Sequence, residues 1–231
     1  MNIPSSSSLL PVRAPNRLTN RPTPVRPLRP ALSEWAKETE IWRCHSPAFG
    51  GKTFNPLGPP RVGGRFRPIL TPTGQVTPTL YGANGLEGAL AETLLRDVPL
   101  KGSARHLMEA KLRGTRYSVV WPTRTLQLAV LYDPEVGRLG VRAADIGGSL
   151  PRDYPWTAEW AQSIHDDEPR ADGLIWVPRN HNRALALMLF GDRVAEYDLD
   201  VLVDSDPLDT GWGRDEVLRL LEAADVALIT D

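Results

Sequence analysis

The sequence predicts an α+β fold, with one folded domain over residues 31–231 and a disordered tail over residues 1–30. Segments with strand periodicity outnumber helical segments, and the two kinds do not alternate regularly as they do around a parallel α/β sheet. Hydrophobic residues make up 41% of the 231 residues, which is enough to build a sizeable core. Little of this hydrophobic content lies in the tail.

The tail combines basic charge with a composition that opposes regular structure. It contains five arginines and no acidic residue (Arg13, Arg17, Arg21, Arg26 and Arg29). It also contains seven prolines (Pro4, Pro11, Pro15, Pro22, Pro24, Pro27 and Pro30). Because proline donates no backbone hydrogen bond and apolar side chains are few, we expect this segment to be disordered. A basic docking tail is the alternative.

The first half of the folded domain predicts two short strands and one helix. Residues 40–45 and 79–83 have the length and apolar content of strands, and residues 50–64 form a loop rich in Gly and Pro between them. Residues 85–96 predict a helix, because apolar residues recur there at helical spacing. Asn84 is the expected N-cap of this helix.

The second half of the domain predicts further strands and two helices. The expected strands are alternating or continuously apolar, and they are residues 104–112, 117–121, 125–132, 173–177, 184–190 and 194–203. Residues 156–165 predict a helix, with large apolar residues at four-residue steps, and residues 214–228 predict a terminal helix.

The charge and the cysteine count favour a protein of the cytoplasm. Lys and Arg number 27 against 28 Asp and Glu, so a net charge of -1 gives no general attraction for nucleic acid or an anionic membrane. No apolar run approaches the ~20 residues of a membrane span. The single cysteine, Cys44, permits no intrachain disulfide, which favours a reducing compartment.

Common cofactor and metal motifs are absent from the sequence. Neither GxGxxG nor GxxxxGK[ST] occurs, and there is no CxxC, HExxH or GxSxG. The four histidines are scattered along the chain, and the one acidic cluster beside a histidine, residues 165–168, is typical of a solvated helix end. We therefore expect no bound metal ion.

Three short segments stand close together in the first half of the domain. They are Gly63-Gly64-Arg65-Phe66, Leu80-Tyr81-Gly82-Ala83 and Ala89-Leu90-Ala91-Glu92. Downstream lie Trp160-Ala161 on a helix, then Asp172-Gly173-Leu174-Ile175-Trp176 and Leu189-Phe190-Gly191-Asp192-Arg193. The order and spacing of these segments resemble the RES domain family, which is named after active-site Arg, Glu and Ser residues. The resemblance covers roughly residues 40–195.

The resemblance implies an ADP-ribosyltransferase-like fold, with mixed or antiparallel sheets and flanking helices, that binds NAD+ in a cleft. Members of the family release nicotinamide and pass ADP-ribose to phosphate, water or a protein. Many are toxins restrained by an antitoxin with a helix-turn-helix domain. We therefore expect an NAD+ phosphorylase or NAD+ glycohydrolase, with protein ADP-ribosyltransferase as the alternative and an antitoxin as partner. The sequence leaves the acceptor open, and also whether the chain forms a homo-oligomer.

The resemblance and the chemistry of cleavage together give roles to four residues. Breaking the nicotinamide bond develops oxocarbenium character on the ribose, which the carboxylate of Glu92 would stabilise. The guanidinium of Arg65 would hold the pyrophosphate, and Gly64 would let the backbone approach the ligand closely. The ring of Tyr81 would stack on nicotinamide, and its hydroxyl would bind ribose or phosphate.

Two further arginines and one departure from the family pattern complete the expected site. Arg43 and Arg179 are candidate contacts for phosphate or ribose. The family serine that follows the Gly-Leu-Ile-Trp segment aligns with Pro178, which has neither a hydroxyl nor a backbone N–H. Ser149 or Ser163 is the alternative source of that hydroxyl. Without it, the chain would be an inactive RES-like module that only binds a nucleotide or a partner.

Overall fold

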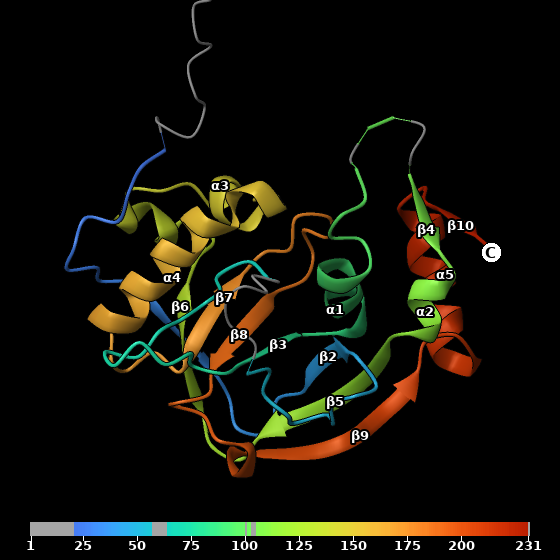
Figure 1. The fold of residues 1–231 in the computed structure, drawn as a ribbon, viewed down its shortest axis with the longest axis horizontal. Coiled ribbons are helices and arrows are strands. Elements are labelled where there is room, and N and C mark those ends of the chain that lie inside the picture. The colour runs from blue at the N-terminus through green and yellow to red at the C-terminus, as the bar shows by residue number, and fades with distance from the viewer. Residues whose placement is uncertain (1–20, 57–63, 100, 103–104, 231) are drawn as a thin grey trace, which may run out of the picture.

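A curled sheet of eight strands forms the centre of the protein (Figure 1). The computed structural model describes residues 21–56, 64–99, 101–102 and 105–230. Within these residues the β6–β7 pair is parallel, and every other neighbouring pair in this sheet is antiparallel. In sheet order the strands are β1 (Leu32–Trp35), β6 (Leu126–Val130), β7 (Gly173–Trp176), β8 (Ala186–Phe190), β3 (Thr79–Ala83), β2 (Ile41–His45), β5 (Arg116–Pro122) and β9 (Leu199–Pro207).

One face of the sheet curls around a hydrophobic core of its own. All eight strands contribute buried side chains to this core, among them Ile41, Leu80 and Leu128, which are fully buried. Because side chains alternate along a strand, the other face of the same strands is left for helices to cover. The observed mixed sheet with flanking helices confirms the predicted α+β fold.

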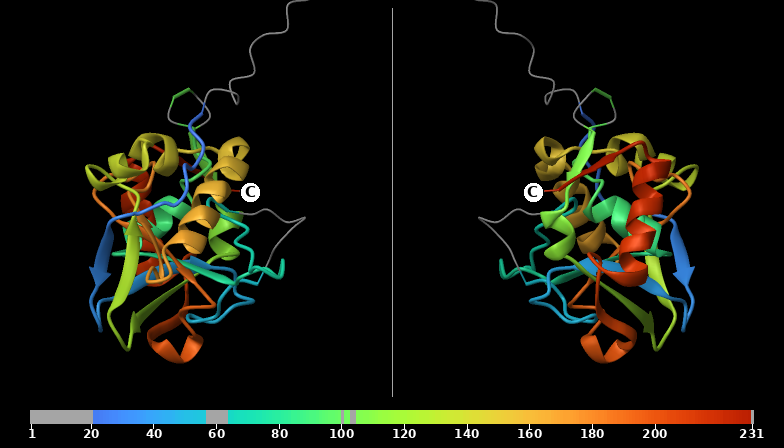
Figure 2. Two further views of the ribbon diagram at one scale, coloured as in Figure 1. Left: turned by 90° about the vertical axis from the view of Figure 1, so that its left-hand side faces the viewer. Right: turned by 90° about the vertical axis from the view of Figure 1, so that its right-hand side faces the viewer.

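Three longer helices cover that second face in two groups. Helix α4 (Tyr154–Asp167) packs into one core with β6, β7 and β8. Helices α1 (Leu86–Thr93) and α5 (Gly211–Ala223) form another core with β2, β5 and β9. Figures 1 and 2 show α1 and α4 standing apart above the sheet, with β3, β7 and β8 beneath the space between them.

Short elements make up the connections. They are α2 (Ala110–Arg113), α3 (Ala143–Gly147), the 3-10 helices η2 (Glu135–Leu139), η3 (Pro151–Asp153) and η4 (Glu196–Asp198), and a parallel pair of strands, β4 (His106–Met108) and β10 (Ala227–Ile229). In the part of the chain that the structure describes, no helix is both long and apolar enough to cross a membrane.

Most of the predicted elements are confirmed, but one strand prediction is wrong over much of its length. Residues 104–112 were expected to form one strand, whereas the structure has a strand only at His106–Met108 and a helix at Ala110–Arg113. The apolar spacing of Met108 and Leu112 fits one turn of helix as well as an alternating strand. The helix buries Leu112 completely, so that burial decides between the two.

Three element ends also differ from the predictions. The strand expected at residues 194–203 begins at Leu199, because Glu196–Asp198 forms a 3-10 turn first. The terminal helix ends at Ala223, and the chain then pairs with β4 as β10. Asn84 does not cap α1; its side-chain oxygen accepts a hydrogen bond from a backbone N–H of the strand region before β8, and Gly85 is the N-cap.

Residues 21–30, the end of the expected disordered tail, lie against α4. Arg26 donates to both carboxylate oxygens of Asp167, with its Nε 3.0 Å from each. Leu28 is 4% exposed and belongs to the core under α4. Arg21 also pairs with Asp153 at 3.2 Å, and Trp156 Nε1 donates to the Pro22 carbonyl, so the folded part extends beyond the boundary expected from composition. Residues 1–20 lie outside the described residues.

Candidate active site

Arg65 lies at the centre of a buried polar cluster between α1 and the segment that follows α3. Its side chain is 1% exposed, although the residue comes from a loop. The next residue, Phe66, has a φ of 72° and packs edge-on against Trp176, with ring centroids 4.9 Å apart. A large side chain in this left-handed conformation is strained, and such strain concentrates at functional sites. Gly63 lies outside the described residues.

Glu92 and Ser149 engage all three nitrogens of the Arg65 guanidinium. Nη1 lies 2.9 Å from each carboxylate oxygen of Glu92. Nε donates to the Ser149 hydroxyl at 2.9 Å, and Nη2 donates to the Ser149 carbonyl at 3.2 Å. The Glu92 side chain is 13% exposed, so this ion pair is largely shielded from water. An arginine, a glutamate and a serine from three separate segments therefore meet at one point.

Tyr81 joins strand β3 to this cluster. Its hydroxyl donates to the backbone carbonyl of Arg65, and its ring lies edge-on to Trp176, with centroids 6.1 Å apart. Burial raises the pKa of Tyr81, so the hydroxyl remains a protonated donor near neutral pH. A β-carbon at Gly64 would lie 3.2 Å from the tyrosine oxygen, which explains the small residue there. The structure thus brings Arg65, Tyr81 and Glu92 together.

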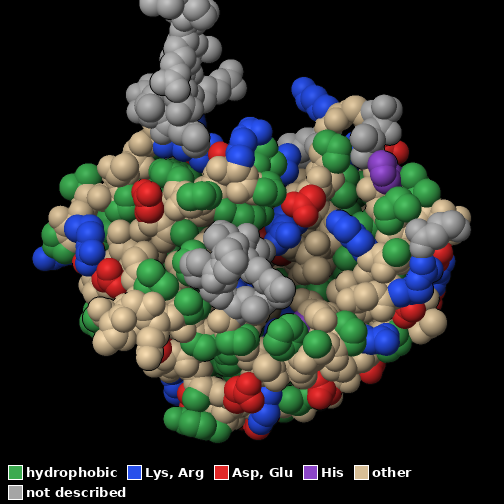
Figure 3. All heavy atoms as spheres, viewed as in Figure 1, with side chains coloured by type: hydrophobic (Ala, Val, Ile, Leu, Met, Phe, Trp, Pro, Cys, Tyr) green, Lys and Arg blue, Asp and Glu red, His purple; other side chains and the backbone are tan. Residues whose placement is uncertain are grey.

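A small cavity lies beside the Glu92 carboxylate. Its volume is about 20 Å³, and its lining residues are Cys44, Tyr81, Gly82, Ala89, Glu92, Thr93 and Trp176. A cavity of this size holds about one water molecule. Burial raises the pKa of Cys44 to about 12, so its thiol is not a nucleophile near neutral pH. Figure 3 shows basic and acidic side chains around a hollow in this face of the molecule.

Arg43 does not join the cluster. Side chains alternate along β2, so Arg43 points to the sheet face opposite Cys44, which lines the cavity. Its Nη1 donates to the carbonyl oxygens of Gly51 and Thr53 at 2.8 and 3.0 Å and so fastens the following loop. Burial lowers the pKa of Arg43 to about 10, which leaves it charged near neutral pH. These contacts give Arg43 a structural role in the loop, and the structure does not place it with Arg65 and Glu92, where a ligand contact was expected.

Ser149 supplies the hydroxyl that the sequence comparison placed at Pro178. Ser149 follows α3, and a β-carbon at Gly147 would lie 2.7 Å from the Val177 carbonyl, so this glycine allows the segment to approach the end of β7 closely. The sequence offered Ser149 as one of two alternatives and did not favour it over Ser163. Ser163 instead lies buried in α4.

Arg179 also lies apart from the Arg65 contacts. It lines a separate, larger pocket together with Glu87 of α1 and with Leu95, which follows that helix. A different arginine, Arg96, was not singled out from the sequence. It lies one turn beyond Glu92, is 30% exposed, and among the described residues forms an ion pair, at 3.4 Å, with the exposed Asp97. In the described residues, no three potential ligand side chains gather to hold a metal ion.

The chain belongs to the RES domain family, because the model of that family, described as RES domain, matches residues 40–210. Its fold is similar to that of a chain in the crystal structure of the M. tuberculosis MbcT-MbcA toxin-antitoxin complex. The two share 19% sequence identity with a TM-score of 0.52, over 76% of this chain and 86% of that chain. This likeness establishes a common fold. None of the curated proteins compared with the sequence matches it.

Proposed function

We propose that this chain is a RES toxin that binds NAD+ and cleaves the nicotinamide–ribose bond, passing ADP-ribose to phosphate or water. The observation that carries the proposal is the contact of Arg65 with both Glu92 and Ser149 in one buried cluster. Membership of the RES domain family and the fold shared with a toxin–antitoxin complex support it. The Ser149 hydroxyl beside Arg65 supports an active enzyme over the inactive module.

Glu92 is the proposed catalytic residue. When the bond from the ribose C1′ to the nicotinamide nitrogen breaks, its electron pair leaves with the nicotinamide and positive charge develops on the ribose. A carboxylate next to the ribose stabilises that charge, and phosphate or water then attacks C1′ and loses a proton. Arg65 acts as a positioning residue, because it holds both carboxylate oxygens of Glu92.

Binding of NAD+ requires the site to widen. The cavity beside Glu92 has a volume of about 20 Å³, whereas cofactor sites usually measure about 300–1,000 Å³. The donors of Arg65 are engaged by the protein, so the pyrophosphate needs another cation. We assign that contact to Arg96, which lies near Glu92 and has only one exposed acidic partner.

A partner protein would restrain such an activity. The similar chain was solved in a toxin–antitoxin complex, and we propose that an antitoxin with a helix-turn-helix domain covers the site of this chain. A cytoplasmic location suits an enzyme that consumes NAD+, and the single cysteine agrees with a reducing compartment. No nucleic acid or membrane enters the proposed reaction.

The test is nicotinamide release from NAD+ by the purified full chain, followed by chromatography. Phosphate present or absent distinguishes a phosphorylase from a glycohydrolase, and labelled NAD+ that modifies protein identifies a transferase. We expect Glu92→Gln to abolish release and the matched control Glu159→Gln, an exposed glutamate on α4, to retain it. Arg96→Ala should raise KM about tenfold with little change in kcat. If the folded wild type releases no nicotinamide, with or without phosphate, the proposal is rejected.

A further inference from the structure

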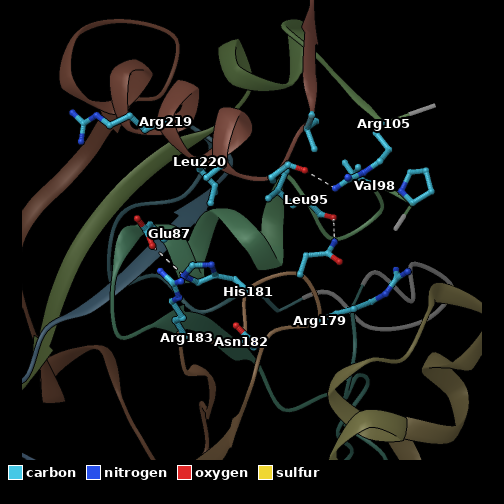
Figure 4. A pocket seen from close by; sticks show the side chains of 15 residues that line it. Glu87, Leu95, Val98, Arg105, Arg179, His181, Asn182, Arg183, Arg219 and Leu220 are labelled. Atoms are coloured by element: carbon cyan, nitrogen blue, oxygen red, sulfur yellow. Dashed lines mark hydrogen bonds and ion pairs between the residues drawn. The ribbon is translucent and has the colours of Figure 1, made fainter. Parts of the chain in front are cut away.

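A second, larger pocket lies between α1, α5 and the loop from Arg179 to Arg183 (Figure 4). Its volume is about 670 Å³, which is within the range of about 300–1,000 Å³ typical of small-molecule sites. Leu95, which follows α1, and Leu220 of α5 supply apolar surface. Arg105 enters from the region before β4. The pocket therefore combines an apolar surface with basic groups from two walls.

The loop that carries two of these arginines is held in place by α1. The Asn180 amide donates to the carbonyl of Leu95, and His181 Nε2 lies 3.0 Å from a carboxylate oxygen of Glu87. Figure 4 shows the Glu87–His181 pair with Arg183 beside it and Arg179 at the other end of the loop. The contacts of Asn180 and His181 therefore hold in place the backbone between Arg179 and Arg183.

Three of the four arginines that line the pocket lack a close carboxylate partner, whereas the fourth, Arg219, pairs with Glu216 at 2.5 Å. Within the described part of the chain, Arg179 and Arg183 make no ion pair or hydrogen bond. Arg105 is held by the Ala224 carbonyl at 2.6 Å, and its carboxylate neighbour, Asp225, is 3.9 Å away and fully exposed. The acidic residue that lines the pocket, Glu87, is paired with His181, so these three guanidinium groups keep positive charge available for an anionic ligand.

An aromatic hollow adjoins the pocket across the Glu87–His181 pair. It has a volume of about 360 Å³, and its lining includes Glu87, His181 and Arg183, which also line the larger pocket. Trp212 lies on its wall and is 48% exposed, with its ring centroid 5.9 Å from that of Trp42. An exposed tryptophan supported by a second ring offers a stacking surface for a planar group.

We propose that the pocket and the hollow form one binding site for a nucleoside polyphosphate, separate from the Arg65–Glu92–Ser149 cluster. The phosphates lie against the guanidinium groups of Arg105, Arg179 and Arg183, which offer planar sets of donors to phosphate oxygens. The base stacks on Trp212. The inference goes beyond the proposed NAD+ cleavage and does not depend on it.

The experiment is a titration of the purified full chain with ATP in the presence of EDTA, followed by calorimetry and tryptophan fluorescence. Adenosine and inorganic tripolyphosphate test the base and the phosphates separately. The variants are Arg179→Ala, Arg183→Ala, Trp212→Leu and Arg65→Met, each checked by circular dichroism. The matched control is Arg138→Ala, which removes an exposed arginine that lines neither hollow.

We expect ATP to bind more tightly than tripolyphosphate and adenosine to bind weakly. Each pocket arginine should contribute about tenfold in Kd, which corresponds to about 1.4 kcal/mol, and binding should weaken as salt is added. Trp212→Leu should weaken ATP about tenfold and leave tripolyphosphate unchanged. Arg65→Met and Arg138→Ala should bind ATP as the wild type does.

Three results overturn the proposal. The first is no binding of ATP to the folded wild type. The second is binding that Arg179→Ala and Arg183→Ala both leave unchanged, because the ligand would then lie outside this pocket. The third is that ATP and tripolyphosphate bind equally tightly and that Trp212→Leu does not change the binding of either. The site would then not recognise a nucleoside. If one of the two pocket arginine variants fails to fold, the other variant and the salt dependence of ATP binding still test the proposal.

Discussion

Removal of the Glu92 carboxylate should destabilise the protein as well as inactivate it. Arg65 is 1% exposed and Glu92 is 13% exposed, so Glu92→Ala leaves a buried guanidinium without its carboxylate contacts. Breaking a buried ion pair from one side costs about 3–5 kcal/mol in the free energy of unfolding. Because Glu92 keeps some access to water, we expect the lower value, about 3 kcal/mol. In a chain of 231 residues this corresponds to a melting temperature lowered by roughly 6–12 °C.

A double variant separates this loss of stability from the loss of chemistry. In Arg65→Met/Glu92→Leu both charges leave together, and apolar side chains of similar length replace them. Replacing a buried ion pair by apolar residues is often neutral or stabilising, so the double variant should recover about 2 kcal/mol of the loss. It should still release no nicotinamide. Urea denaturation followed by circular dichroism measures the stability, and chromatography measures nicotinamide release.

Two outcomes of this cycle would refute the reasoning. If Glu92→Ala unfolds within about 0.5 kcal/mol of the wild type, the Arg65–Glu92 pair is solvated and contributes as a surface pair does. If the double variant is less stable than Glu92→Ala, the apolar replacements do not fill the space of the pair. Release of nicotinamide by folded Glu92→Ala would refute the catalytic role alone and leave the stability argument intact.

Three further predictions concern Ser149, His45 and Leu28. Ser149→Ala should slow nicotinamide release about tenfold, because a buried Nε of Arg65 loses its acceptor, while Ser163→Ala and Pro178→Ser should leave the rate unchanged. Burial lowers the pKa of His45 below its ordinary value of about 6.5, so the unfolded chain binds a proton more readily than the folded one. The free energy of unfolding should therefore fall as the pH drops from about 7 to 5.5, by no more than about 1.4 kcal/mol per pH unit. Urea denaturation measures it: the stability of His45→Gln should not fall in this way, whereas that of the exposed control His106→Gln should. Leu28→Ala should lower the free energy of unfolding by about 2 kcal/mol, and Val25→Ala, at a side chain 81% exposed, should not change it; equal effects would mean that this segment is not packed on α4.

Periodicity predicted the strands well where burial on both sheet faces leaves an unmistakable apolar run. Strands β7 and β8 are buried at every residue, and both were expected within a few residues of their observed ends. Periodicity failed around residues 104–112, where the two fully buried residues, Leu107 and Leu112, are too few to distinguish a helix from a strand. The ordered segment over residues 21–30 was missed because it is held by a few specific contacts, such as those of Arg21, Arg26 and Leu28, which do not change the composition.

The residues of the candidate site were predicted in part. Arg65, Tyr81 and Glu92 lie near one another in the sequence, so their motif spacing is informative. Ser149 was one of two alternatives, because it comes from a distant segment and only the three-dimensional packing of the α3 region on the end of β7 brings it to Arg65. Arg43 was expected at the site because arginine binds phosphate, but arginine also binds backbone carbonyls, and the sheet face on which Arg43 lies places it beside those.

The burial of Arg65 determines which arginine positions Glu92 and which one contacts the substrate. For Arg65 to bind a pyrophosphate, it would have to release acceptors on Glu92 or Ser149, and hydrogen bonds to charged groups contribute about 1.5–3 kcal/mol each. A substrate contact by Arg96 breaks no comparable set of hydrogen bonds, since its ion pair within the described part of the chain is with the exposed carboxylate of Asp97. The less costly arrangement therefore leaves Arg65 holding Glu92 in place. With these two roles, substitutions at Arg65 change kcat through the orientation of Glu92, whereas substitutions at Arg96 change KM.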